Sequence, residues 1–215
     1  MERNPVTPIL HRPTSTPAGA IVLAHGRGAD PHDLEPLLEL LDPDRRLLGI
    51  FPHGPLRLPP GGQHWYIVRQ VGSPDRETFR PSFDQLAAQL ESLLSEHGVG
   101  WDRTVLGGFS QGAVMSYALA LGAGRPRPAA VLAFSGFIPS VEGFDVALGD
   151  RAGLPVSISH GALDPVISVD FARDARERLT AAGLDVRYRE DPVGHTIAPA
   201  ALAQARAVIE DAVGG

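Results

Sequence analysis

The sequence predicts an α/β fold with a mostly parallel sheet of about six or seven strands and helices on both faces. Short apolar runs alternate along the chain with segments whose apolar residues recur at the helical period, an order typical of βαβ units. The 215 residues, 43% of them apolar, are enough to bury a substantial core. No internal repeat or linker interrupts the chain, so residues 1–215 are expected to form one domain.

The first strand and helix are predicted between residues 20 and 41. Residues 20–24 are an apolar run, and the glycine-containing turn 25–28 follows. Four leucines then recur at the spacing of one helix face, with Asp33 as the expected cap and Pro36 tolerated because it lies in the first turn. These leucines are Leu34, Leu37, Leu38 and Leu41.

A second strand is expected over residues 47–51, and a loop rich in proline and glycine follows over residues 52–81. A loop of this length is usually functional or mobile. Ser82 and Gln85 have the spacing of a capping box, so a helix is predicted to begin there. Gly98 is the expected end of that helix.

The C-terminal half continues the alternation. Ser168 is expected to cap the second of its three helices, Gly183 to end that helix, and Pro199 to open the third. The helices are predicted over residues 111–121, 169–182 and 199–213. The strands are predicted over residues 104–109, 129–134, 156–159 and 186–190.

The composition excludes several classes of protein. The absence of cysteine excludes disulfide scaffolds, cysteine nucleophiles and thiolate metal sites. A net charge of -6 does not favour binding to nucleic acid or to anionic membranes. The N-terminus shows no signal peptide, and no apolar run approaches the roughly 20 residues of a membrane helix. We therefore expect a cytoplasmic protein that binds no nucleic acid and does not insert stably into membranes.

The segment Gly108-Phe109-Ser110-Gln111-Gly112 matches the pattern G-x-S-x-G. The pattern alone is a weak signal, but its place between an apolar strand and a helix of small residues is the setting of a nucleophile elbow. Glycines on both sides of the serine allow the strand and the helix to approach each other, and the helix N-terminus favours negative charge. The segment therefore predicts that Ser110 is a nucleophile.

A serine hydroxyl needs a general base to become a good nucleophile. His195 follows the last predicted strand and so lies at the C-terminal edge of the sheet, where parallel α/β proteins place their sites. His160 also ends a strand, and His25 and His64 are further alternatives. We favour His195 as the base. The alternative interpretation is that His195 is a histidine of a surface loop with no catalytic role.

The third member of a serine triad is an acid that orients the imidazole. Asp164 lies just past the strand 156–159, which gives the order Ser, Asp, His after three different strands. Asp191 is a rival, but it shares a short connection with His195. Asp170 is better explained as a surface carboxylate in the first turn of a helix, where the helix dipole favours it. The alternative interpretation of Asp164 is a turn residue with no catalytic role.

Backbone N–H groups are the expected donors to an oxyanion. The amide of Gln111 directly follows the predicted nucleophile, and a second donor is expected from the loop 25–28, where we favour the amide of Arg27.

Five blocks in this order resemble the α/β-hydrolase fold, and more closely the small carboxylesterase/phospholipase family that includes the acyl-protein thioesterases. The blocks are residues 23–30, 108–113, 134–139, 160–166 and 194–195. The resemblance implies Ser110, Asp164 and His195 as the catalytic triad. It implies the amides of Arg27 and Gln111 as the oxyanion hole.

The resemblance also implies a compact hydrolase that has no large cap domain, no metal and no cofactor, and that often forms homodimers. Trp65 matches the family's tryptophan in the loop beside the acyl site. Arg27 departs from the family, which commonly carries leucine after the His-Gly step. Its guanidinium either favours an anionic or polar group at the substrate mouth or points to solvent or a carboxylate. The departure argues against long-chain lipid-modified protein substrates.

Apolar residues on loops at the predicted active edge are candidates for lining an acyl pocket. They have the equally good alternative of a satellite core beneath long loops. The loops 52–81 and 137–153 are either mobile lids or fixed turns. The candidate pocket residues are Trp65, Phe137, Ile138, Val166 and Ile167.

These observations predict a serine carboxylesterase that hydrolyses carboxylic esters or thioesters of small to medium acyl groups through an acyl-enzyme intermediate. Its partner is a small ester substrate. One alternative is a hydrolase of lactones or small anionic esters that uses Arg27. Another is a non-catalytic binding module that keeps the fold.

Overall fold

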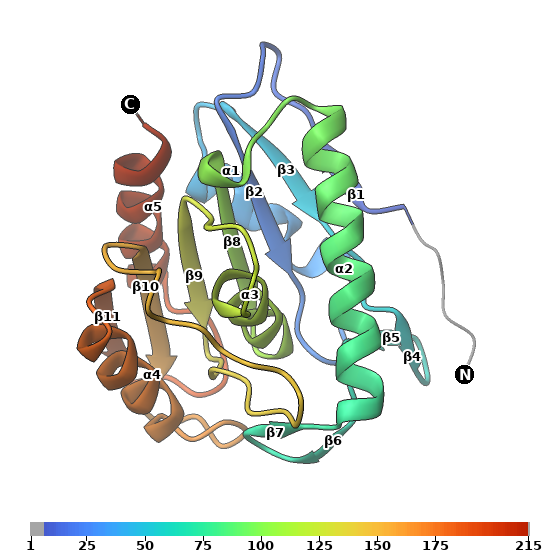
Figure 1. Cartoon of the computed structure of the whole chain (residues 1–215), viewed down its shortest axis with the longest axis vertical. Coiled ribbons are helices and arrows are strands. Elements are labelled where there is room, and N and C mark those ends of the chain that lie inside the picture. The colour runs from blue at the N-terminus through green and yellow to red at the C-terminus, as the bar shows by residue number, and fades with distance from the viewer. Residues whose placement is uncertain (1–6, 215) are drawn as a thin grey trace.

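The computed structural model describes residues 7–214. Its centre is a seven-stranded sheet in which one edge strand is antiparallel and all other pairs are parallel. The strands are β1 (Ile9–His11), β2 (Gly19–Ala24), β3 (Leu47–Phe51), β8 (Thr104–Phe109), β9 (Ala130–Phe134), β10 (Pro155–Gly161) and β11 (Asp185–Asp191). They lie in the order β1-β3-β2-β8-β9-β10-β11, and the parallel strands point toward the lower edge of the sheet in Figure 1.

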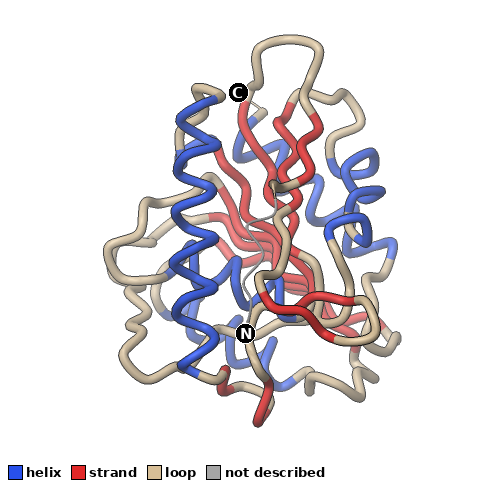
Figure 2. Tube along the Cα trace, turned by 90° about the vertical axis from the view of Figure 1, so that its right-hand side faces the viewer, coloured by secondary structure: helices blue, strands red, loops and turns tan. Residues whose placement is uncertain are grey.

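Helices cover both faces of this sheet, as Figure 2 shows. The helices α2 (Arg76–Glu96), α3 (Gln111–Leu121) and α4 (Asp170–Ala181) pack on one face. The other face is covered by the single turn α1 (Leu38–Leu41) and by α5 (Pro199–Val213). Side chains along β2 alternate between the two apolar clusters, so the sheet separates two cores. The predicted fold class is confirmed.

The helix α3 is buried along its whole length. Its small residues follow from its position, because it packs closely against β2, β8 and β9. A Cβ atom at Gly112 would lie 1.9 Å from the carbonyl oxygen of Ala24, so only glycine allows the first turn of α3 to reach the end of β2.

The helix predicted from the leucine pattern at residues 34–41 is wrong in its extent. The structure has two 3₁₀ turns, Pro31–Asp33 and Glu35–Leu37, before the single α-helical turn of α1. Asp30 rather than Asp33 caps the first turn, because its carboxylate accepts from the backbone N–H of His32 at 2.9 Å. Pro36 has no N–H and disfavours helical geometry in the residue before it, so the helix cannot extend back through this segment.

The segment predicted as a long loop contains ordered structure. Two short hairpins occupy it, β4 (Leu56–Leu58) with β5 (Gly62–His64), and β6 (Val68–Gln70) with β7 (Ser73–Pro74). The last of these strands leads directly into α2, so the segment contributes to the folded structure over most of its length.

The capping box at Ser82 and Gln85 is wrong. The helix α2 begins at Arg76, and the carboxylate of Asp75 accepts from the backbone N–H of Thr78 at 3.1 Å. Ser82 is buried inside the helix. The helix passes through Pro81. Because proline inside a helix is costly, the sequence favours a helix that begins after this residue.

Other helix ends agree better with the sequence. Gly98 and Gly183 follow α2 and α4 with φ values of +65° and +81°, as expected for glycine stops. The helix α4 begins at Asp170, one residue later than predicted, so Ser168 is not the capping residue. The Ser168 hydroxyl still accepts from the Asp170 N–H at 3.3 Å. The loop 137–153 is tied to the end of α3 by two backbone hydrogen bonds of 2.9 and 2.8 Å.

Among residues 7–214, no helix is both long enough and apolar enough to span a bilayer. The prediction about the N-terminal signal concerns residues 1–6 in part, which lie outside the described residues.

Candidate active site

Ser110 stands in a strained turn between β8 and α3. Its φ of +55° lies in the left-handed region, which residues other than glycine rarely adopt. The Ser110 N–H donates to the carbonyl oxygen of Phe134 at 2.9 Å and so holds the turn against β9. A Cβ atom at Gly108 would lie 2.4 Å from the backbone of Gly112, which explains why both flanking positions are glycine. The turn places the hydroxyl at the N-terminus of α3.

His195 links Ser110 to Asp164. The Nε2 atom of His195 lies 3.0 Å from the Ser110 hydroxyl oxygen, and Nδ1 lies 2.6 Å from Oδ2 of Asp164. An ionised carboxylate only accepts hydrogen bonds, so the Nδ1–H donates to Asp164 and leaves the Nε2 lone pair facing the serine. The structure thus brings together the three side chains predicted from three separate loops.

Asp164 is held as an anion in a buried position. Its side chain is 0% exposed, and Oδ1 accepts from the N–H groups of Val166 and Ile167 at 2.8 and 2.9 Å. Burial opposes ionisation, but the hydrogen bonds from His195 and from the two backbone groups outweigh it and lower the pKa of the Asp164 carboxyl. The carboxylate is therefore charged at neutral pH.

The loops that carry Asp164 and His195 are bound to each other. The N–H of Ala162 donates to Asp191 O at 2.7 Å, and the N–H of Leu163 donates to Val193 O at 3.0 Å. A Cβ atom at Gly161 would lie 2.1 Å from the carbonyl oxygen of Gly194, so glycine is required for this approach. The two loops extend the pairing of β10 and β11 and fix the separation of the acid and the imidazole.

Two of the other histidines considered as bases, His25 and His64, have structural partners. His25 is buried, donates through Nδ1 to Gly26 O at 2.7 Å, and accepts through Nε2 from the Gly54 N–H at 3.0 Å. His64 is buried, and its Nδ1 lies 3.2 Å from Tyr66 O. Neither forms a hydrogen bond with Ser110 in the part of the chain that the structure describes. Burial lowers the pKa of both side chains.

The rival carboxylates are each paired with an arginine. Asp191 accepts from the guanidinium of Arg189 at 2.7 Å, and Asp170 accepts from that of Arg173 at 3.0 Å. His195 has its hydrogen bond with Asp164 instead of either rival. The site that the structure assembles is therefore the one that contains Asp164.

The two predicted oxyanion donors have unused N–H groups. Neither the amide of Arg27 nor that of Gln111 has an acceptor among the described residues, outside the bonds of regular elements. The Arg27 loop is held in place by its neighbour, because the Gly28 N–H donates to Gln63 O at 2.7 Å. Free amides at the N-terminus of a helix and on an adjacent loop are suited to bind an anion.

The side chain of Gln111 has a role that the sequence analysis missed. Its Oε1 accepts from the Trp65 N–H at 2.9 Å, and its Nε2 donates to Tyr66 O at 2.9 Å. The indole N–H of Trp65 in turn donates to His25 O at 2.8 Å. These bonds join the residue after the nucleophile to the segment between β5 and β6 and to the start of the loop 25–28. No local pattern in the sequence signals them.

Most of the candidate pocket residues are buried. Trp65, Phe137, Ile138 and Ile167 are at most 5% exposed and belong to the apolar core, whereas Val166 is 54% exposed. The Arg27 side chain is exposed and has no ion pair among residues 7–214. The burial favours a core role for four of these residues, and their contact with substrate stays a prediction.

Among the described residues, no group of three or more histidine, aspartate or glutamate side chains is arranged to hold a metal ion.

Comparison with known proteins gives the family. The sequence model of a family described as phospholipase/carboxylesterase matches residues 7–212. Acyl-protein thioesterase 1 of Eremothecium gossypii is 30% identical over 206 residues, which cover 89% of this chain and 86% of that protein.

Two solved structures extend the comparison. The esterase PE8 has a TM-score of 0.78 and 28% identity, with 96% of this chain and 98% of that chain covered. The carboxylesterase of Bacillus cereus has a TM-score of 0.83 over 95% of this chain and 93% of that chain, and its 21% identity supports the fold alone. Since the family match spans almost the whole chain and the fold agrees with it, the chain belongs to the phospholipase/carboxylesterase family and is a serine hydrolase of the α/β-hydrolase fold.

Proposed function

We propose that this protein hydrolyses carboxylic esters and thioesters of small to medium acyl groups, with Ser110 as the nucleophile. The observation that carries the proposal is the position of the His195 ring, which lies 3.0 Å from the serine hydroxyl on one side and 2.6 Å from Asp164 on the other. Both contacts are within the range that proton transfer requires. The name of the E. gossypii relative, a thioesterase, supports the inclusion of thioesters.

In the acylation step, the Ser110 hydroxyl oxygen attacks the carbonyl carbon while His195 Nε2 takes the hydroxyl proton. The charge of Asp164 stabilises the imidazolium that forms. The carbonyl oxygen becomes an anion that accepts hydrogen bonds from the amides of Arg27 and Gln111. His195 then donates its proton to the leaving alcohol or thiol, and the acyl-enzyme remains.

In the deacylation step, a water molecule takes the place of the leaving group. His195 Nε2 accepts a proton from the water as its oxygen attacks the acyl carbon. Collapse of the second tetrahedral intermediate releases the carboxylic acid and returns the proton to Ser110. The same two amides hold the oxyanion in both steps.

The substrate contacts form a further part of the proposal. Val166 is exposed two residues after Asp164 and is the proposed apolar contact for the acyl group. Trp65, Phe137, Ile138 and Ile167 support the acyl site from the core beneath. Arg27, with an exposed side chain, is the proposed contact for a polar or anionic part of the substrate.

Two features predicted from the sequence are retained as proposals. A homodimer is checked by light scattering on the purified protein, and a cytoplasmic location by fractionation of cells. Neither changes the chemistry proposed for the site.

The related proteins are named as thioesterases and carboxylesterases, so they favour the ester hydrolase over the lactonase and over the binding module.

The proposed function is tested by intact-mass analysis after treatment with a fluorophosphonate probe. We expect one adduct on the wild type, none on Ser110→Ala, and one on Ser95→Ala, whose serine is exposed on α2. Ester turnover by Ser110→Ala is expected to fall by about 10³-fold or more with the fold intact, because the nucleophile is lost. A folded wild type without an adduct, or an adduct that persists in Ser110→Ala, would contradict the proposal.

A further inference from the structure

A second histidine, which is fully buried, contacts the carboxylate of Asp164. His160 lies near the end of β10, and its side chain is 0% exposed. Its Nε2 atom is 2.8 Å from the carbonyl oxygen of Ile167 and 3.2 Å from Oδ2 of Asp164. Both neighbours are acceptors, so Nε2 carries the proton; it donates to the carbonyl oxygen of Ile167, and Oδ2 of Asp164 is a second, longer polar contact beside that bond. The other ring nitrogen, Nδ1, is buried and has no hydrogen-bond partner among the described residues.

The contact adds a polar neighbour to the groups that hold Asp164. Oδ1 accepts from the N–H groups of Val166 and Ile167, and Oδ2 accepts from His195, while Nε2 of His160 lies beside Oδ2 without a hydrogen bond to it. Because the Asp164 side chain is 0% exposed, water cannot take the place of a neighbour that is removed.

His160 also closes the loop that carries Asp164. Its backbone belongs to β10, whereas its ring holds the carbonyl oxygen of Ile167 on the far side of the loop 161–167. The imidazole therefore fixes the end of the loop whose N–H groups hold the carboxylate of Asp164. The β-strand provides a rigid base for the contact.

The surroundings of the ring leave it neutral. Burial lowers the pKa of His160, although the bond to Ile167 and the charge of Asp164 act in the opposite direction. The charged or titratable groups that face the ring are Asp164, His195 and Glu190, and Glu190 is opposite His160 on β11.

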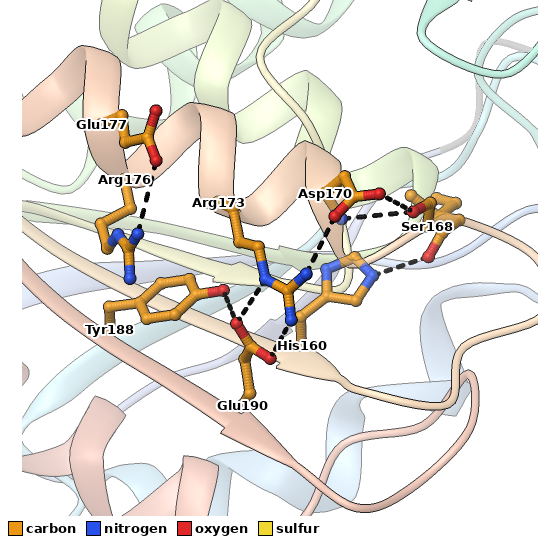
Figure 3. A network of polar contacts seen from close by, with 9 residues as sticks. His160, Ser168, Asp170, Arg173, Arg176, Glu177, Tyr188 and Glu190 are labelled. Atoms are coloured by element: carbon orange, nitrogen blue, oxygen red, sulfur yellow. Dashed lines mark hydrogen bonds and ion pairs between the residues drawn. The ribbon is translucent and has the colours of Figure 1, made fainter.

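A network of polar contacts next to His160 balances the charge of Glu190. Figure 3 shows Arg173 between Glu190 and Asp170, with Tyr188 on the other side of Glu190. The Glu190 carboxylate accepts from the guanidinium at 2.9 and 2.8 Å and from the tyrosine hydroxyl at 2.6 Å. Because Glu190 is engaged in this way, Asp164 is the carboxylate that lies against the His160 ring.

We propose that His160 is a positioning residue for the reaction at Ser110, because its Nε2–H binds the carbonyl oxygen of Ile167 and so fixes the loop whose N–H groups orient Asp164 toward His195. The inference rests on the proposed function. His160 does not touch the substrate, and it takes up no proton in the reaction. It acts by keeping the carboxylate in one rotamer and by closing the loop 161–167 around it.

Three substitutions test this role. His160→Leu removes the donor, and His160→Gln keeps an amide N–H near the position of Nε2. His160→Asn keeps a polar side chain whose amide reaches only the position of Nδ1. We expect kcat of the Leu and Asn variants to fall by about tenfold to a hundredfold, since small misplacements of catalytic groups have effects of this size. KM is expected to change by less than about twofold, and Gln to restore most of kcat.

The pH profile supplies a readout that a purely structural role would not change. Without the polar N–H group of His160 at 3.2 Å from Oδ2, the charge of Asp164 is less stabilised and acts more strongly on the imidazolium of His195. The acid limb of kcat/KM is therefore expected to move to higher pH in His160→Leu and His160→Asn. It is expected to stay in place in His160→Gln, where the donor is retained.

Each outcome discriminates between the two proposals. If the wild type does not react with a fluorophosphonate, the proposed function fails and this inference fails with it. If the wild type reacts but His160→Leu keeps the wild-type kcat and pH profile, only this inference is overturned. Equal losses in the Gln and Asn variants would overturn it as well, because they would show that a donor at the Nε2 position has no special effect. The Gln and Asn comparison decides the question even if His160→Leu does not fold.

Discussion

Single residues in this protein perform tasks that depend on a few atoms. Ser110 occupies a backbone conformation that its neighbours impose, and the free amide that follows it belongs to the same turn. Asp164 accepts three hydrogen bonds within the protein. Arg27 differs from both, because its amide and its side chain serve separate roles in the proposal and only the side chain is changed by substitution.

Arg27→Leu tests the side chain alone. The exposed guanidinium has no ion pair among residues 7–214 and so is available to an anionic substrate group. We expect kcat/KM for esters that carry a carboxylate to fall by about tenfold, the value of one charge-assisted hydrogen bond. Neutral esters of the same length are expected to be unaffected, since the backbone donor remains.

Arg206→Leu is the matched control, because Arg206 is an exposed arginine of α5 that pairs with Glu210. It is expected to leave both substrates unchanged. Equal losses on charged and neutral esters in Arg27→Leu would show that the guanidinium does not select anionic groups.

At the scale of secondary-structure elements, the start of α2 decides how the segment before it is arranged. The helix begins at Arg76, next to the hairpin of β6 and β7, and continues through Pro81. Asp75 supplies the cap and also pairs with the guanidinium of Arg69 at 2.9 Å. Its side chain therefore joins the helix to the hairpin.

Asp75→Ala is expected to lower the free energy of unfolding by about 1 kcal/mol, because the first turn of α2 loses its cap. Ser82→Ala is expected to have a smaller effect, since Ser82 lies within the helix. Urea denaturation of both variants checks the comparison.

Arg69→Ala separates the cap from the ion pair, because Arg69 is exposed and a surface ion pair contributes little. A larger loss in Ser82→Ala than in Asp75→Ala would contradict the helix start described above.

At the scale of the whole molecule, the burial of histidines makes stability depend on pH. Burial lowers the pKa of His25, His64 and His160 below the ordinary value of 6.5. As the pH falls through that value, the unfolded chain takes up protons that the folded protein does not, and the free energy of unfolding decreases. The lowered pKa values of Asp164 and Glu190, the latter about 2, cause a further loss in more acidic solution, below the ordinary carboxyl range.

We therefore expect the free energy of unfolding, measured in urea, to be lower at pH 5.5 than at pH 7.5. His64→Asn is expected to reduce the dependence on pH, because asparagine keeps a donor near the Nδ1 position that faces Tyr66 O but does not titrate. A free energy of unfolding that stays constant or rises on acidification would refute the prediction.

That residues 1–215 form a single domain stays a prediction.

Much of this protein was predictable from local sequence patterns. The helices α3 and α5 have the predicted bounds, and the six predicted strands agree within a few residues, because apolar periodicity and the glycine and proline signals act over short distances. The short strands β1 and β4 to β7 were not predicted. Ser110, Asp164 and His195 were recognisable for a related reason. Each follows its own strand, and parallel strands end at a common edge of the sheet, so the order of the chain already brings them near one another.

Only the tertiary structure decided the remaining features. Several residues near residue 80 are able to cap a helix, and the contacts of Asp75 with Thr78 and Arg69 select one of them. The bonds of the Gln111 side chain to Trp65 and Tyr66 join positions about 45 residues apart, which no local pattern encodes. His160 is an alternative base by its position in the sequence. The fold buries it against Asp164, and both oxygen atoms near its Nε2 are hydrogen-bond acceptors. Local patterns determined which residues are near the site, and long-range hydrogen bonds and burial determined what each of them contacts.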